Sequence, residues 1–298
     1  MRAITIGVFD GVHIGHAYMM KKLVEHSKKF DLIPTAITFE KPYEAIIEPE
    51  NFDGLITTSE ERIQLMKMIG IEDVIIQDLK EISHMNEIEY IEMLLKEFNM
   101  KSIYVGYDFR FGKRAKGDTQ LLKEVGTSKG FTVEIIPKII EDGKRISSSL
   151  IRKALKDGMP EIAAHYLGRS FEIYGKVVRE RGIGSAIGFP TANISRNNKD
   201  LIVPKYGVYL VTSNVNGEEL YGVMNIGVRP TTDEDGDVTY EVHFLDKQID
   251  LLGTFLNVKL VKYMRGELKF SNLSDLKMAI QKDVNDAKKM IKERKIYA

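Results

Sequence analysis

The feature that most constrains the fold is a change of pattern near residue 168. Before this point, short β-branched runs alternate with helical patterns, and beyond it such runs follow one another without intervening helices. Alternation favours a parallel sheet covered by helices, whereas consecutive strands favour an antiparallel barrel or sandwich. A chain of 298 residues is long enough for both. We therefore predict two domains, residues 1–167 and 168–298, with the boundary after a short helix that Pro160 opens.

The first half carries the signals of a doubly wound, parallel-sheet α/β domain. Thr58 and Glu61 have the spacing of a capping box before an amphipathic helix, and Asn86 can cap a second helix. The strand-like runs are apolar on both faces, which is typical of a parallel sheet covered by helices on both sides. The expected strands are residues 4–9, 34–39, 74–77, 103–106 and 132–136.

The second half predicts a small antiparallel β-barrel domain with a C-terminal helix. Asn216 and Gly217 lie between two strand-like runs and indicate a two-residue hairpin, because both positions need positive φ angles. One long helix follows, with Ser274 as its expected N-cap and an apolar face that should pack on the strands. The expected strands are residues 171–178, 208–215, 219–228, 238–245 and 255–261.

Composition narrows the classes of function. The chain has no cysteine, which excludes a disulfide framework, thiolate metal sites and thiol nucleophiles. Its 43 Lys and Arg residues balance 43 Asp and Glu residues, which argues against a generally basic nucleic-acid binder. We find neither a signal peptide nor a run of about 18 apolar residues, so we expect a cytoplasmic protein that spans no membrane.

The first group of chemistry-bearing residues is the string GVFDGVHIGH, from Gly7 to His16, where a strand is expected to turn into a helix. Gly11 and Gly15 allow a ligand to approach the backbone closely, and a helix N-terminus offers N–H groups to an anion. His13 and His16 are three residues apart and can share one helix face, so we expect them to bind nucleotide phosphates. A zinc site and a purely structural histidine pair are the alternatives.

A second anion-binding signal is the string GKRISSSLIR, from Gly143 to Arg152. It places three hydroxyl groups at an expected helix start between Arg145 and Arg152. The alternative is an N-cap with more hydroxyls than it needs, flanked by exposed arginines. Its occurrence together with the histidine string favours a nucleotide site in the first half.

The most specific string of the second half is GFPTAN, from Gly188 to Asn193. Together with Gly182 and Gly184, it makes a pliable loop that can close over phosphates. Thr191 and Asn193 are two residues apart in an extended segment, so both oxygens can face one side and hold Mg²⁺ bound to ATP. A turn followed by a polar strand is the alternative.

These strings together resemble the bacterial bifunctional riboflavin kinase/FMN adenylyltransferase (FAD synthetase) family. The string VGYDFRFG after the fourth expected strand also matches its first domain, and the strings YGVY, NIGVRPT, YEVH and MRGELKF match its second. The resemblance implies an N-terminal nucleotidyltransferase domain that adenylylates FMN to FAD and releases pyrophosphate. It implies a C-terminal kinase domain that phosphorylates riboflavin to FMN. The implied partners are ATP, riboflavin, FMN and FAD, with Mg²⁺ as the metal and no nucleic acid.

The resemblance also implies roles for single residues. Glu241 would take the proton from the riboflavin 5′-hydroxyl, and His243 on the same strand face would be structural. Thr191 and Asn193 would hold the metal. Asp108 would face the nucleotide or the flavin, and Arg265 would lie near the flavin or help to order the lid of the kinase site. The other catalytic positions are His13, His16 and Arg152. The remaining ATP-binding positions are Phe9, Asp10, Gly15, Arg145, Ser148, Ser149, Gly188 and Pro190.

The chain differs from the family pattern at three places. Residues 38–43 lack a His-Pro pair near Pro42, Ser185 replaces a basic residue in the kinase loop, and Ser149 replaces a threonine while keeping its hydroxyl.

Two alternatives stay open from the sequence. Only one domain could be active, or the adenylyltransferase could prefer another phosphorylated acceptor. The second alternative is a flavin-sensing regulator that binds RNA. Its only support is the basic tail, and a solvated helix end also explains that tail. That tail contains Lys288, Lys289, Lys292, Arg294 and Lys295. The sequence does not determine the oligomeric state.

Overall fold

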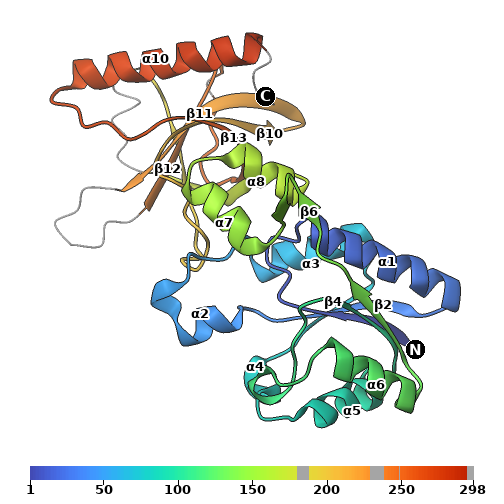
Figure 1. Ribbon diagram of the computed structural model, residues 1–298. Coiled ribbons are helices and arrows are strands. Elements are labelled where there is room, and N and C mark those ends of the chain that lie inside the picture. The colour runs from blue at the N-terminus through green and yellow to red at the C-terminus, as the bar shows by residue number, and fades with distance from the viewer. Residues whose placement is uncertain (180–187, 229–237, 248, 294–298) are drawn as a thin grey trace. The chain divides into compact units, whose positions relative to one another are not determined.

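A computed structural model describes residues 1–179, 188–228, 238–247 and 249–293 (Figure 1). The chain divides into two units, Met1–Leu150 and Ile151–Ala298, and each is described by itself. Helix α8 (Pro160–Leu167) begins at Pro160, as the sequence predicts. The domain boundary at residues 167 and 168 stays a prediction.

The first unit contains a five-stranded parallel sheet with the strand order β3-β2-β1-β4-β5. Strand β1 pairs with β2 on one side and with β4 on the other, so the direction of winding reverses between β1 and β4. Ligands of doubly wound sheets bind beyond the carboxyl ends of the strands at such a reversal. The predicted fold of this half is confirmed. The strands are β1 (Arg2–Ile6), β2 (Ile33–Thr38), β3 (Asp73–Ile76), β4 (Met100–Gly106) and β5 (Thr132–Ile136).

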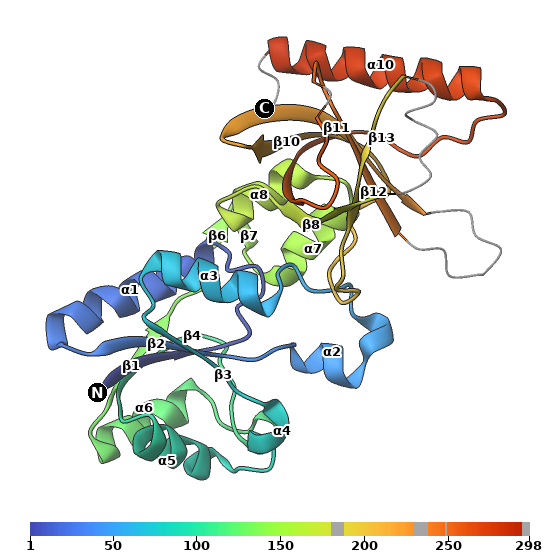
Figure 2. The ribbon, with the colours of Figure 1, turned by 180° about the vertical axis from the view of Figure 1, so that it is seen from behind.

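Helices cover both faces of this sheet (Figures 1 and 2). Neighbouring residues of β1 point to opposite faces: Ala3 packs in the core with α1 and α3, and Ile4 packs in the core with α5 and α6. Capping boxes begin α3 and α5, at Thr58 and Asn86, as predicted. The larger helices are α1 (Ile14–Phe30), α3 (Ser59–Ile69), α5 (Glu87–Glu97) and α6 (Thr119–Lys129). The shorter ones are α2 (Tyr43–Ile47), η1 (Pro49–Asn51), α4 (Leu79–Ile82) and η2 (Lys113–Ala115).

The structure corrects two expectations in this unit. The first strand ends at Ile6 instead of continuing to Phe9, because Phe9 has a φ of 54° that no strand residue adopts. A hairpin of β6 (Ile140–Glu141) and β7 (Lys144–Arg145) was not predicted. Its turn is Asp142–Gly143, with φ angles of 50° and 72°, which is a two-residue hairpin signal that the sequence does contain.

The second unit contains a closed antiparallel barrel with the strand order β10-β11-β12-β9-β8-β13, closed by the pairing of β13 with β10. The predicted barrel is confirmed, but β9 was expected only as an extended segment and is a strand of the sheet. The strands are β8 (Glu172–Val178), β9 (Ala192–Ser195), β10 (Gly207–Val215), β11 (Glu218–Val228), β12 (Val238–Phe244) and β13 (Phe255–Arg265). Helix α7 (Ser148–Lys156) runs into this unit from the first.

Two local predictions in the second unit have different outcomes. Asn216 and Gly217 connect β10 to β11 with φ angles of 54° and 86°, which confirms the hairpin. Helix α10 (Leu273–Lys292) packs Val284 and Ala287 into the same core as Val208 of β10, as its apolar face predicts. Ser274 is not the N-cap. Asn272 caps the helix instead, and its side-chain oxygen accepts from the Asp275 N–H at 2.9 Å.

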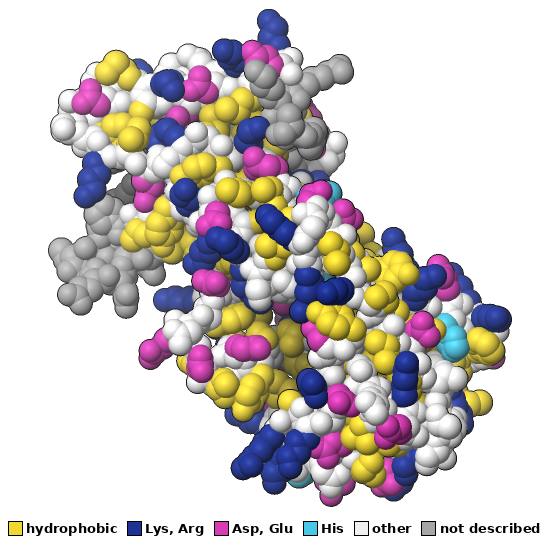
Figure 3. Space-filling model, viewed as in Figure 1, with side chains coloured by type: hydrophobic (Ala, Val, Ile, Leu, Met, Phe, Trp, Pro, Cys, Tyr) yellow, Lys and Arg dark blue, Asp and Glu magenta, His cyan; other side chains and the backbone are white. Residues whose placement is uncertain are grey.

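The surface has no large area of one charge on the face shown in Figure 3, where positive and negative side chains are interspersed. This agrees with the balanced composition of the chain. No helix in the described ranges is long and apolar enough to cross a membrane.

Candidate functional sites

The loop after β1 has an unusual backbone. Phe9 and Val12 have φ angles of 54° and 39°, and Gly11 has a φ of 78°. A positive φ is costly for a β-branched residue such as valine, and strained backbone clusters at functional sites. The loop therefore needs surrounding contacts that hold it in place.

Asp10 supplies several of these contacts. Its carboxylate is buried and accepts from the N–H groups of Ile56 and Thr57 at 3.0 and 3.1 Å and from the Thr57 hydroxyl at 3.2 Å. The same hydroxyl accepts from the Gly11 N–H at 2.9 Å. Asp10, predicted to bind ATP, thus also joins the loop to the segment before α3.

His13 and His16 lie together, as their spacing predicts. His13 is the N-cap of α1, and its Nδ1 accepts from the His16 N–H at 3.3 Å, so the neutral ring carries its proton on Nε2. The two rings are stacked with centroids 3.6 Å apart, and Phe9 meets His16 edge-on at 5.2 Å. Burial, followed by the neighbouring His13, holds the pKa of His16 well below its ordinary value. His16 is therefore a neutral imidazole at pH 7.

The described residues do not favour zinc at this histidine pair. Among them, no group of three His, Cys, Asp or Glu side chains is placed to hold a metal ion.

The Nδ1 atom of His16 is buried and has no hydrogen-bond partner within the described ranges. Gly15 lies against the His13 ring, where an added Cβ would be 3.1 Å from Cε1.

The second predicted string reaches the same loop. The Ser148 hydroxyl donates to the Asp10 carbonyl at 2.8 Å, and the Ser147 hydroxyl accepts from the Leu150 N–H at 3.2 Å, which caps the start of α7. Ser149 is exposed at the same helix end. Arg152, nearly buried, follows one turn later on α7. The structure therefore joins the two strings of the first unit through Ser148 and Asp10.

Two residues that were predicted to bind different ligands are paired in this structure. The Arg145 guanidinium, on β7, forms an ion pair with the carboxylate of Asp108, which follows β4. The same guanidinium lies over the Tyr107 ring, 5.1 Å from its centroid. Both charged side chains are about half exposed, so this pair is accessible to solvent.

The barrel carries a row of polar residues across three strands. Glu241 of β12 is opposite Asn193 of β9 and opposite Asn225 of β11. Facing residues of neighbouring strands share one side of the sheet, and this is the side away from the buried Tyr240 and Val242. Asn225 was not singled out from the sequence, although it begins the matched string NIGVRPT.

The segment before β9 is held next to this row. His243 Nδ1 is 2.9 Å from the Pro190 carbonyl oxygen, and the His243 ring meets Phe189 edge-on at 5.4 Å. This supports the structural role expected for His243. Gly188 has a φ of 93° and is exposed, and Thr191 is half-buried. Residues 182, 184 and 185, the other predicted parts of this loop, lie outside the described ranges.

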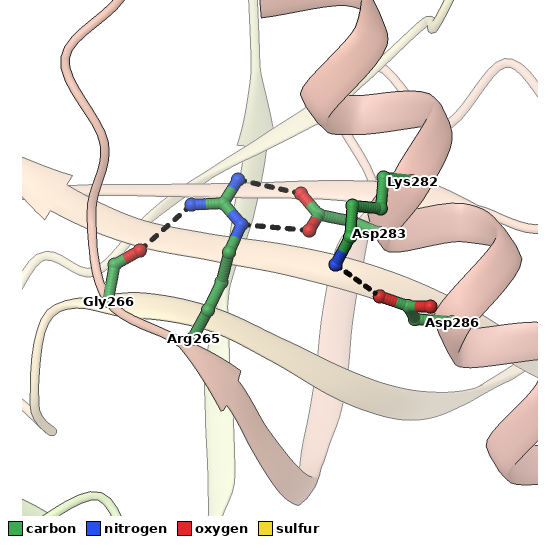
Figure 4. A network of polar contacts seen from close by, with 5 residues as sticks. All are labelled: Arg265, Gly266, Lys282, Asp283 and Asp286. Atoms are coloured by element: carbon green, nitrogen blue, oxygen red, sulfur yellow. Dashed lines mark hydrogen bonds and ion pairs between the residues drawn. The ribbon is translucent and has the colours of Figure 1, made fainter.

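Arg265 at the end of β13 is bound to the C-terminal helix (Figure 4). Its Nε and Nη2 atoms donate to the two carboxylate oxygens of Asp283 at 2.8 and 2.7 Å, and its Nη1 donates to the Gly266 carbonyl at 2.8 Å. All three guanidinium nitrogens are therefore engaged within the protein. Its predicted place near the flavin stays a prediction.

Comparisons with known proteins identify the family of each part of the chain. Residues 1–150 match the sequence model of the FAD synthetase family, and residues 167–291 match that of riboflavin kinase. A parallel nucleotide-binding sheet followed by a kinase barrel thus defines an enzyme of flavin cofactor synthesis. The chain belongs to the bifunctional riboflavin kinase/FMN adenylyltransferase family.

Relatives with that name align along nearly the whole chain. The protein of Escherichia coli (strain K12) is 35% identical over 283 residues, which cover 94% of this chain and 90% of the relative. The protein of Pseudomonas fluorescens is 34% identical over 292 residues, with 95% and 91% covered. Among solved structures, one described as a macrolide-efflux protein from Streptococcus pneumoniae has a TM-score of 0.87 and 26% identity, covering 96% of this chain and 93% of that one.

Proposed function

We propose that the two reactions of this family take place at the two groups of residues described above. The protein phosphorylates riboflavin to FMN with its riboflavin kinase domain and adenylylates FMN to FAD with its FAD synthetase domain, using ATP in both steps. The assignment of each step to single residues is ours.

For adenylyl transfer, we assign the strained loop and the start of α7 to ATP. A phosphate oxygen of FMN attacks the α-phosphorus of ATP, the bond to the β-phosphate oxygen breaks, and pyrophosphate leaves. The side chains need only orient the reactants and stabilise negative charge. We assign the phosphates to His13, His16 and Arg152 and to the hydroxyls at the start of α7. The other ATP positions are Phe9, Asp10, Gly15 and Arg145.

The ion pair of Arg145 with Asp108 affects how this site would bind phosphate. Because its guanidinium is paired with Asp108, an incoming phosphate competes with that carboxylate for the same donors. Release of Asp108 would leave its carboxylate to hydroxyls of the nucleotide or flavin, which agrees with the role the family resemblance gives it.

For riboflavin phosphorylation, we assign the polar row of the barrel. The riboflavin 5′-oxygen attacks the γ-phosphorus of ATP, its proton passes to the Glu241 carboxylate, and ADP leaves. Both families use ATP with a divalent metal, and we propose Mg²⁺ held by the oxygens of Thr191 and Asn193. Mg²⁺ takes few protein ligands and completes its shell with water and phosphate oxygens, so a hydroxyl and an amide oxygen fit it. When bound, the metal would neutralise phosphate charge. Gly188 and Pro190 are assigned to ATP in the same loop.

The observation that carries the assignment is that His13 and His16 lie in the first unit of the chain, whereas Glu241 lies in the second. Glu241→Ala should abolish FMN formation from riboflavin and leave FAD formation from supplied FMN unchanged. His16→Ala should do the converse. Riboflavin or FMN is incubated with ATP and Mg²⁺, and FMN and FAD are separated by chromatography. Loss of both activities in one folded variant would refute independent sites.

The same assay separates the alternatives that the sequence leaves open. Accumulation of FMN without FAD would show that only the kinase is active on these substrates. We retain a cytoplasmic location and the absence of a nucleic-acid partner as predictions. Lys288 of the basic tail forms an ion pair with Asp246, whereas Arg294 and Lys295 lie outside the described ranges.

A further inference from the structure

Arg62 is a buried cation that the sequence did not single out. It lies in the first turn of α3, and its side chain is fully buried. Its Nη1 donates to the Val8 carbonyl at 2.9 Å, and its Nη2 donates to the Glu40 carbonyl at 2.7 Å and to the Ser59 hydroxyl at 3.0 Å. Its Nε atom has no hydrogen-bond partner within the described ranges.

The charge of Arg62 is not needed for packing. Among the described residues it forms no ion pair, and its acceptors are neutral oxygens. Burial lowers the pKa of Arg62 from its ordinary value, while the more distant carboxylates of Asp10, Glu40 and Glu60 raise it. A buried charge without an ionic partner costs stability, and an apolar side chain would fill the same space without that cost. The guanidinium therefore has to be explained by what its nitrogens bind rather than by the space that it fills.

The acceptors of Arg62 show what that function is. Val8 and Glu40 follow the carboxyl ends of the adjacent strands β1 and β2, at the edge of the sheet where the proposed ATP site lies. The Val8 carbonyl also accepts from the Thr38 hydroxyl at 2.9 Å. The residue after Val8 is Phe9, the first residue of the strained loop. Arg62 therefore fixes the chain at the point where the loop begins.

The same short segment fixes the loop further along. Ile56 and Thr57 bind Asp10, and the Thr57 hydroxyl binds the Gly11 N–H. The capping box of Thr58 and Glu61 fixes the start of α3 and with it the position of Arg62. Residues 56–62 thus hold the strained loop at two points. Among the described residues that make these contacts, Arg62 alone has a positively charged side chain.

We propose that Arg62 is a positioning residue for adenylyl transfer: its guanidinium joins the ends of β1 and β2 and holds the loop that presents His13 and His16. The proposal rests on the assignment of this loop to ATP. Displacement of catalytic groups by about 1 Å can lower a rate by about a hundredfold. Loss of the clamp should therefore lower kcat more than it raises KM.

The test uses the full chain with Arg62→Met and Arg62→Lys. Methionine keeps much of the side-chain volume and removes both the hydrogen-bond donors and the charge. Lysine keeps the charge, but it has a single nitrogen, whereas Arg62 donates from two. Leu94→Ala is the matched control, because Leu94 is buried in the core on the opposite face of the sheet from the core that holds Phe9 and Val12 of the loop. Riboflavin phosphorylation by the same chain reports on the other domain.

We expect Arg62→Met to lower kcat for FAD formation at least about tenfold, with KM for ATP and FMN changed less than about threefold. Riboflavin phosphorylation should be unchanged. Arg62→Lys should recover at least about threefold of the lost kcat and stay about threefold or more below the wild type. Leu94→Ala should lower the unfolding temperature. Its kcat for FAD formation should stay near that of the wild type.

Wild-type kcat in folded Arg62→Met, or equal loss in Leu94→Ala, would overturn the proposal. Should Arg62→Met not fold, Arg62→Lys decides: a kcat within about threefold of the wild type overturns the proposal, and a larger loss supports it. His16→Ala in the same assay separates the premise from the inference. If His16→Ala keeps FAD formation, the assignment of the loop to ATP fails; if it abolishes FAD formation and the Arg62 variants do not, only the inference fails.

Discussion

The bidentate pair of Arg265 and Asp283 makes a quantitative prediction for Arg265→Met. The substitution removes three hydrogen bonds and leaves the Asp283 carboxylate, whose side chain is 6% exposed, without its cation. Breaking a buried ion pair by removing one partner costs about 3–5 kcal/mol. The Arg265 side chain is 24% exposed, so solvent screens part of the interaction and we expect about 2–4 kcal/mol.

The unfolding of the full chain is measured by calorimetry, and FMN formation from riboflavin and FAD formation from FMN are measured on the same variants. At about 3 °C per kcal/mol for a unit of this size, the unfolding transition of the second unit should fall by about 6–12 °C. FAD formation from supplied FMN should not change. Because an uncompensated charge causes the loss, the double variant Arg265→Met, Asp283→Leu should recover most of it.

The result that would refute this reasoning is specific. If Arg265→Met raises the KM for riboflavin while the unfolding transition stays in place, Arg265 acts on the flavin, as the family resemblance implies, and does not anchor α10. If the double variant is as unstable as Arg265→Met, the unpaired Asp283 carboxylate is not the cause.

Two further predictions concern the proposed sites. Because the folded-state pKa of His16 lies well below the unfolded value of 6.5, the unfolded state binds more protons, and stability of the first unit should fall as pH drops below about 6.5. His16→Ala should reduce that slope, by up to about 1.4 kcal/mol per pH unit, in urea unfolding followed by circular dichroism; an unchanged slope would contradict the lowered pKa of His16. Asn193→Ala should raise the Mg²⁺ concentration needed for half-maximal riboflavin phosphorylation about tenfold or more, with FAD formation as the control. An unchanged requirement would exclude Asn193 as a metal ligand.

Local signals account for most of the fold. The capping boxes at Thr58 and Asn86, the hairpin at Asn216 and the proline at the start of α8 all act over a few residues, so they can be read directly. The period of the apolar residues predicts the parallel sheet and the barrel for the same reason. Strand ends were less accurate: β1 stops before Phe9 because the loop geometry, and not the propensity of its residues, decides where pairing ends.

The errors at the N-cap and at β9 have a similar cause. Asn272 and Ser274 are both good capping residues, and only the backbone path decides that Asn272 receives the Asp275 N–H. Strand β9 has four residues and pairs with β12 through only two of them, Ala192 and Asn193, so no periodic pattern marks it.

The sequence by itself determined the family, the two fold classes and the residue types that each reaction needs, because these depend on short strings and local periodicity. Only the tertiary structure decided which side chains meet. Asp108 pairs with Arg145, Arg265 with Asp283, and Arg62 with two strand ends, and each partner is distant in sequence. The cost of a buried charge depends on the groups that surround it in space, and residue spacing along the chain does not contain that information.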